Sequence, residues 1–169
     1  YYHFALGHLH AELARSYRSQ DDFQKAVDHY RKAIEADPEA EFIVGELTDL
    51  LLQANRWRDA VQENEALLRS NPDNIQARRI LGHIYTRLIA GTTNPKEQEE
   101  YVRKGMEHYR YLTEKRPQDA EGWVRLGWLY RVSSNSLEAE KAFQKALELE
   151  GDNEGALGEL AQLYASLKE

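Results

Sequence analysis

The chain has 169 residues, of which 41% are hydrophobic and 30% are charged, a composition that fits a folded chain with a charged surface and excludes intrinsic disorder. Its formal net charge is -7, whereas a generic nucleic-acid binder carries a basic excess, so we predict no nucleic-acid partner. The absence of cysteine excludes disulfides and thiol nucleophiles but leaves the compartment open. No stretch offers the roughly 20 apolar residues of a membrane-spanning helix, so we expect no membrane insertion in this segment.

Several residue types recur every 34 positions along the chain. The recurrences are Leu13, Leu47 and Leu81; Pro38 and Pro72; Leu126 and Leu160; and Tyr130 and Tyr164. A fixed period of this length is typical of a repeat array, in which each unit is one supersecondary element stacked on the next. Such arrays usually bind a partner along an extended surface.

In chain order, the period predicts an N-terminal extension at 1–6 and repeats at 7–40, 41–74, 75–119 and 120–153, followed by a capping helix at 154–169. Each repeat is expected to form two helices. In the fourth, Trp123, Leu126, Gly127 and Tyr130 make a helical stripe in the first half, and Ala139, Phe143 and Ala146 make one in the second. Proline ends the second helix, because it lacks an N–H group and clashes with the preceding turn.

The third repeat is longer than its siblings. Pro72 and Pro117 are 45 residues apart, which places an 11-residue insertion between Tyr85 and Gly105. We expect the first helix to extend to Gly91. The second should start at Asn94 as N-cap, with Pro95 in the first helical position and Glu97 as a capping-box acid, and end near residue 116. This hairpin either tolerates extra length or projects as a lip that contacts a second protein.

The pattern Trp123-x-x-Leu126-Gly127-x-x-Tyr130, followed by Ala139, Phe143 and Ala146, resembles the tetratricopeptide repeat (TPR) family. Asn64 departs from it, because an aromatic residue is usual there. The resemblance implies a single all-α domain, a right-handed α-solenoid of antiparallel helix pairs with about four repeats and a capping helix. It also implies a non-catalytic scaffold for protein–protein interaction.

In TPR arrays the first helix of each repeat lines a concave groove, and the resemblance assigns fixed positions of that helix to the groove. Five arginines and two acids occupy these positions, giving a local charge of +3. The predicted ligand-binding residues are Arg15, Arg18, Asp49, Gln53, Arg79, His83, Arg87, Trp128 and Arg131. Because arginine suits bidentate carboxylate capture, we predict an extended acidic peptide or a C-terminus as partner. The alternative is that these arginines pair with acids of adjacent helices and that the long hairpin covers Trp128.

The sequence carries no catalytic or metal-binding motif. The six histidines show no HExxH spacing, so we predict no metal site, no cofactor and no enzymatic activity. Two alternatives of other classes stay open. One is a regulatory or targeting domain of a larger enzyme or secretion or assembly protein, and the apolar start of the chain favours it. The other is a structural array that self-associates through Tyr1, Tyr2 and Phe4.

Overall fold

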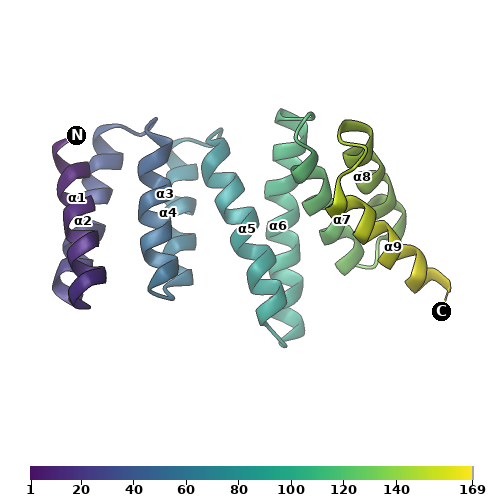
Figure 1. The fold of residues 1–169 in the computed structure, drawn as a ribbon, viewed down its shortest axis with the longest axis horizontal. Helices are drawn as coiled ribbons and strands as arrows, with labels where there is room; N and C mark the ends of the chain where they lie inside the picture. Colours follow the sequence, from purple (N-terminus) through teal and green to yellow (C-terminus); the bar gives the residue numbers. More distant parts are fainter. Residues whose placement is uncertain (169) are drawn as a thin grey trace. The chain divides into compact units, whose positions relative to one another are not determined.

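The computed structural model describes residues 1–168, and within that range the chain forms nine helices and no strand (Figure 1). The helices are α1 (Tyr2–Tyr17), α2 (Gln20–Ala36), α3 (Glu41–Gln53), α4 (Trp57–Ser70), α5 (Ile75–Gly91), α6 (Pro95–Lys115), α7 (Ala120–Val132), α8 (Ser136–Leu149) and α9 (Glu154–Lys168). The predicted fold class, an all-α solenoid of TPR helix pairs, is confirmed. The first helix begins at Tyr2, so most of the predicted N-terminal extension is helical.

Two compact units divide the chain, the first comprising Tyr1–Ile80 and the second beginning at Leu81, within α5. In the first unit α1 packs on α2, α2 on α3, and α3 on α4. In the second unit α6 packs on α7, α7 on α8, and α9 on both α7 and α8. Each helix therefore buries its apolar stripe against its neighbours in the sequence.

The long third hairpin has the predicted limits. Helix α5 has 17 residues against 13 in α3 and α7, and α6 has 21 residues against 14 in α4 and α8. Asn94 caps α6 by accepting a hydrogen bond from the Lys96 N–H at 3.1 Å, with Pro95 in the first turn. In the second unit, α6 reaches past the ends of α7 and α8 (Figure 1).

The predicted capping box of this hairpin is wrong. The backbone N–H of Asn94 donates to the Thr92 hydroxyl at 3.2 Å, and that hydroxyl donates to the Glu97 carboxylate at 2.7 Å. The Thr92 hydroxyl therefore bridges the Asn94 N–H and the Glu97 carboxylate, which a capping box would join directly. A side chain of the loop thus accepts the hydrogen bond of the N-cap residue.

Glycines on the first helices receive aromatic rings from the second helices. A Cβ atom on Gly82 would lie 2.8 Å from the Tyr109 ring, and one on Gly127 would lie 2.6 Å from the Phe143 ring. Both rings are almost fully buried. Any side chain at these positions would collide with the ring. The two glycines therefore allow each helix pair of the second unit to pack closely.

The second repeat replaces this glycine–aromatic pair by a polar one. Thr48 stands at the register of Gly127, and Asn64 stands at that of Phe143. Both are buried, and the Asn64 side-chain amide donates to the Thr48 hydroxyl and to the Ala60 carbonyl, each at 2.9 Å. Thr48 is larger than the glycine it replaces, and Asn64 is smaller than the aromatic residue it replaces. The hydrogen bond between them pairs two buried polar groups.

Helix α9 covers the apolar end of the second unit. Leu160 and Leu163 pack against Ala139 and Phe143 of α8, and Ala156 packs against Ala146. Leu157 and Tyr164 lie partly exposed beside this buried stripe, and the opposite face of α9 is exposed at Gly158, Gln162 and Ala165. This arrangement is the one expected of a capping helix, with one apolar and one solvated face.

Candidate functional site

The predicted site residues of the first unit lie on a surface of mixed charge. The Arg15 Nε donates to the Gln53 Oε1 at 3.1 Å, which joins α1 to α3, and the Arg15 guanidinium also pairs with Glu12. Asp49 is exposed on α3. The structure therefore brings Arg15 and Gln53 together, but an acid that the predicted set omits already neutralises this arginine.

Arg18 ends α1 in the left-handed conformation, with φ of 52°. A non-glycine residue pays a conformational cost in this region, and such costs concentrate at tight turns and functional sites. Its side chain is exposed at the turn into α2. Arg18 is thus the residue at which the chain turns from α1 into α2.

Acidic groups surround the buried tyrosine of the first unit. Burial and, secondarily, the charge of Glu46 raise the pKa of Tyr30 to about 12, so the phenol stays neutral at physiological pH. Glu46 lies 3.9 Å from the Nδ1 atom of His8. Together with Glu12, this carboxylate makes the first unit a poor candidate for an exclusively anionic ligand.

Two arginines of the second unit, Arg87 and Arg125, lie near His83. The pKa of His83 lies below its ordinary value, because surrounding protein atoms reduce its hydration and because Arg125 and Arg87 oppose an added positive charge. Helices α5 and α7 therefore bring these three side chains into electrostatic contact. Glu121 acts in the opposite direction and lies 3.4 Å from the Arg125 guanidinium.

Arg125 is a site residue that the sequence reasoning missed. The family-derived groove positions do not include it, although they include Glu121, one helical turn before it. The available signal was that i, i+4 spacing, since residues four apart are neighbours on a helix surface. With Arg125, two arginines from α5 and α7 lie near His83, whose lowered pKa disfavours its charged form.

Trp128 and Arg131 extend this surface along α7. Trp128 is half-buried, and the Arg131 Nε donates to the Glu159 Oε2 of α9 at 2.8 Å. Both partners of this ion pair are mostly shielded from water, at 29% and 20% exposure. For Arg131 the alternative interpretation, pairing with an acid of an adjacent helix, is therefore the one observed.

Arg79, His83 and Arg87 follow one another at four-residue spacing on α5, which places them along one side of that helix. Arg79 belongs to the first unit, is exposed, and has polar interactions of its own. His83 and Arg87 belong to the second unit, where they join Arg125.

Within residues 1–168 no group of three or more histidine or acidic side chains is arranged to hold a metal ion. None of the described helices is both long enough and apolar enough to cross a membrane. Stacked antiparallel helix pairs with exposed cationic side chains define a helical-repeat protein of the kind that binds other proteins.

The comparisons with known proteins give the family. Residues 17–84 and 120–153 match two models described as tetratricopeptide repeat. The chain belongs to the TPR family, whose repeats form protein–protein interaction scaffolds.

Two curated relatives are much longer than this chain. It is 35% identical over 146 residues to the protein CTR9 homolog of Arabidopsis thaliana, covering 84% of this chain and 12% of that protein. It is 24% identical over 144 residues to superkiller protein 3 of Schizosaccharomyces pombe, covering 85% of this chain and 10% of that protein. The chain thus spans about a tenth of the length of these relatives.

Solved structures share the fold at low sequence identity. MamA matches with a TM-score of 0.69 and 16% identity, covering 94% of this chain and 84% of that one. TTC0263, a TPR protein of Thermus thermophilus, matches with a TM-score of 0.64 and 18% identity, covering 95% and 82%. A TPR protein of Parabacteroides merdae matches with a TM-score of 0.68 and 19% identity, covering 94% and 59%.

Proposed function

We propose that this scaffold binds an extended acidic peptide, or a C-terminal carboxylate, on the cationic surface that His83, Arg87 and Arg125 form in the second unit. The observation that carries the proposal is that Arg87 of α5 and Arg125 of α7 both lie near enough to His83 for their charges to act on it. Burial is the main cause of the lowered pKa of His83, and the two arginines add to it. An anion bound there would offset the mutual repulsion of Arg87 and Arg125.

The half-buried Trp128 is proposed to flank the bound peptide. Tryptophan and arginine are the residue types enriched among binding hot spots. Arg131 forms an ion pair with Glu159, so we propose that it fixes α7 to α9 beside the bound peptide and does not contact the peptide itself. Arg15, Arg18, Asp49, Gln53 and Arg79 remain predicted contacts in the first unit.

The decisive test is peptide binding by a charge-reversed surface. The probe is a fluorescein-labelled peptide of ten glutamate and aspartate residues, with its C-terminus either free or amidated. A charge-assisted hydrogen bond contributes about 1.5–3 kcal/mol, so the double variant Arg87→Glu, Arg125→Glu should bind at least about 10-fold more weakly by fluorescence anisotropy.

The matched control is Arg103→Glu with Arg116→Glu, which makes the same change in net charge at two exposed residues of the α6 region. This control should bind like the unaltered chain. Equal weakening of both double variants would show a nonspecific charge effect and would overturn the proposal. A preference for the free C-terminus would identify the carboxylate as the recognised group.

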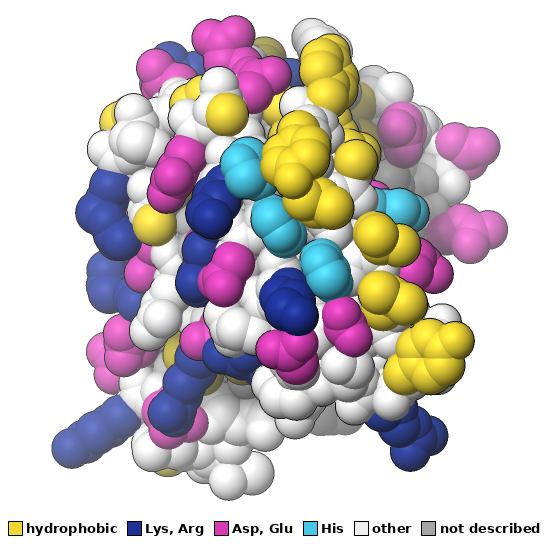
Figure 2. All heavy atoms as spheres, turned by 90° about the vertical axis from the view of Figure 1, so that its left-hand side faces the viewer, with side chains coloured by type: hydrophobic (Ala, Val, Ile, Leu, Met, Phe, Trp, Pro, Cys, Tyr) yellow, Lys and Arg dark blue, Asp and Glu magenta, His cyan; other side chains and the backbone are white. Residues whose placement is uncertain are grey.

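A second candidate function is self-association through the start of α1. Tyr1 and Tyr2 are exposed, and Figure 2 shows hydrophobic side chains gathered on this face of the first unit. Phe4 is already packed edge-on against Phe42 at 5.1 Å, so the two tyrosines are the proposed contacts. Sedimentation velocity should then show a concentration-dependent dimer that Tyr1→Ser, Tyr2→Ser abolishes.

A regulatory or targeting role within a larger protein is the remaining alternative. The length of the curated relatives supports it. In that case the acidic peptide would lie in the same protein or its assembly, and the binding experiment above applies unchanged.

A further inference from the structure

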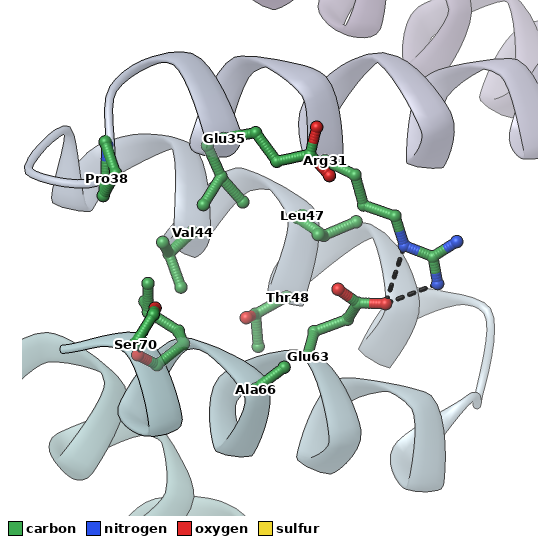
Figure 3. A pocket seen from close by; sticks show the side chains of 11 residues that line it. Arg31, Glu35, Pro38, Val44, Leu47, Thr48, Glu63, Ala66 and Ser70 are labelled. Atoms are coloured by element: carbon green, nitrogen blue, oxygen red, sulfur yellow. Dashed lines mark hydrogen bonds and ion pairs between the residues drawn. The ribbon is translucent and has the colours of Figure 1, made fainter. Parts of the chain in front are cut away.

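An apolar cavity of about 400 Å³ lies in the first unit between α2, α3 and α4 (Figure 3). Ile34, Val44, Leu47 and Leu67 give it apolar walls. The Arg31 guanidinium and the Glu63 carboxylate pair beside it, with 2.8 Å between Nε and Oε1. An apolar cavity of about 150 Å³ is sufficient to bind benzene, so this one has room for a larger ring.

The fourth repeat shows what fills the corresponding space. Val44 and Trp123 stand at the same register, separated by one repeat of 34 residues and one of 45. Trp123 packs against the buried cluster of Ala120, Ala146 and Ala156, and Leu149 of α8 packs against the same cluster. The equivalents of Ala146 and Leu149 in the first unit are the cavity residues Leu67 and Ser70. Leu67 is larger than Ala146 and packs with Val44 and Ala77, so it fills part of this space, and the cavity of about 400 Å³ lies beside it.

Hydrogen bonds to the backbone carbonyl of the proline before each repeat support the same conclusion. In the fourth repeat the Trp123 indole N–H donates to the Pro117 carbonyl at 2.9 Å. In the third, Arg78 stands at the register of Trp123 and donates to the Pro72 carbonyl from Nη2 at 2.9 Å. Pro38 is the equivalent proline before the second repeat, and it lines the cavity. The Val44 side chain has no hydrogen-bond donor for the Pro38 carbonyl.

The charged residues that line the cavity are Arg31, Glu35 and Glu63, so their formal charges sum to -1, with Arg31 paired to Glu63. Glu35 lines the cavity and is exposed, and Asp37 ends α2 beside Pro38. The last turn of α2 contains no basic residue, so nothing there offsets the negative end of the helix dipole. A cation next to an inserted ring would therefore be stabilised.

We propose that this cavity is a docking site for a tryptophan of a partner protein, flanked by a basic residue. The indole enters the space that Trp123 fills in the fourth repeat, its N–H donates to the Pro38 carbonyl, and the neighbouring cation faces Glu35 and Asp37. This site is independent of the cationic surface in the second unit, so either can fail without the other.

The test is a methyl NMR titration of the full chain with the peptide acetyl-Lys-Trp-Lys-amide. Saturable shifts are expected at the methyl groups of Ile34, Val44, Leu47 and Leu67. Acetyl-Lys-Leu-Lys-amide and acetyl-Glu-Trp-Glu-amide should each bind at least about 10-fold more weakly, because one lacks the indole and the other reverses the charge. Binding of free indole without binding of the tryptophan peptide would overturn the docking proposal.

Two variants fill the cavity from within. Val44→Trp places the chain's own indole there and should abolish peptide binding while raising the melting temperature. Ser70→Leu, which introduces the Leu149 equivalent, should weaken binding at least about 10-fold and guards against misfolding of the first variant. Val132→Trp adds the same side chain in the second unit and should leave binding unchanged. Undiminished binding by folded Val44→Trp and Ser70→Leu would refute the proposal.

The reciprocal variant Trp123→Val should create a second site of the same kind. In that chain the methyl shifts on peptide addition are expected at Leu147 and Leu149 as well. If Trp123→Val does not fold, the cavity-filling variants still decide the question.

Discussion

Three histidine rings of the first unit form a row between α1 and α2. The Nδ1 atoms of His3 and His29 are 3.0 Å apart, and the rings of His29 and His10 stack with a centroid distance of 5.8 Å. His10 in turn contacts the Asp22 carboxylate at 2.8 Å. Histidine side chains are visible beside the hydrophobic ones on this face (Figure 2). Since one imidazole of the His3–His29 pair must accept the shared hydrogen, at least one of these two rings must be neutral for the contact to form.

This row should make stability fall in mild acid. Burial, followed by the charges of His3, His10 and Lys32, lowers the pKa of His29, while Asp28 acts against the shift. The unfolded chain therefore binds more protons than the folded one below about pH 6.5, so the free energy of unfolding decreases as pH falls through that window. His83 contributes in the same direction. Urea unfolding between pH 5 and 8 measures the effect.

His29→Gln should flatten this pH dependence, and His8→Gln should not, because His8 lies outside the row. The lowered pKa of Asp22 affects stability only near and below its ordinary value of 3.8, outside the measured range. An unchanged slope in His29→Gln would show that the row does not couple folding to protonation.

At the scale of the helix, the glycine–aromatic contacts predict a sharp contrast between two glycines of the second unit. Gly127→Ala should lower the free energy of unfolding by about 1–3 kcal/mol, because its Cβ would overlap the Phe143 ring. Gly158→Ala in α9 should raise it by roughly 0.5–1 kcal/mol, because nothing lies within 4 Å and alanine favours the helix. Denaturant titration compares the two, and equal effects would contradict the packing argument.

Local signals in the sequence were sufficient for the helices but not for their side-chain contacts. Gly91, Asn94 and Pro95 predicted the ends of α5 and α6 correctly, because caps and breakers act within one turn. The pairing of Arg131 with Glu159 joins residues of two helices and has no local signature. The spacing of Glu121 and Arg125 indicates their pairing on α7, but the approach of Arg125 to His83 depends on how α5 and α7 pack.

For the molecule as a whole, α9 is predicted to stabilise the second unit by closing its apolar end. A chain ending at Asn153 loses the burial of Leu160 and Leu163, at about 1.5–3 kcal/mol each, and exposes Phe143. Its urea midpoint should fall correspondingly. Leu157→Ala, at 49% exposure on the same helix, should change the free energy of unfolding by less than about 0.5 kcal/mol. An unaltered midpoint after truncation would show that α9 is dispensable.

The 11 inserted residues of the third repeat are divided between α5 and α6 in numbers that matter for helix packing. Helix α5 exceeds α7 by four residues and α6 exceeds α8 by seven, which are about one and two whole turns. Additions of whole turns rotate neither helix about its axis, so the Gly82–Tyr109 contact survives 11 extra residues between its partners. The hairpin can therefore change length in such steps while the angular phase of its packed faces is conserved, whereas a change by two residues would turn those faces away from each other.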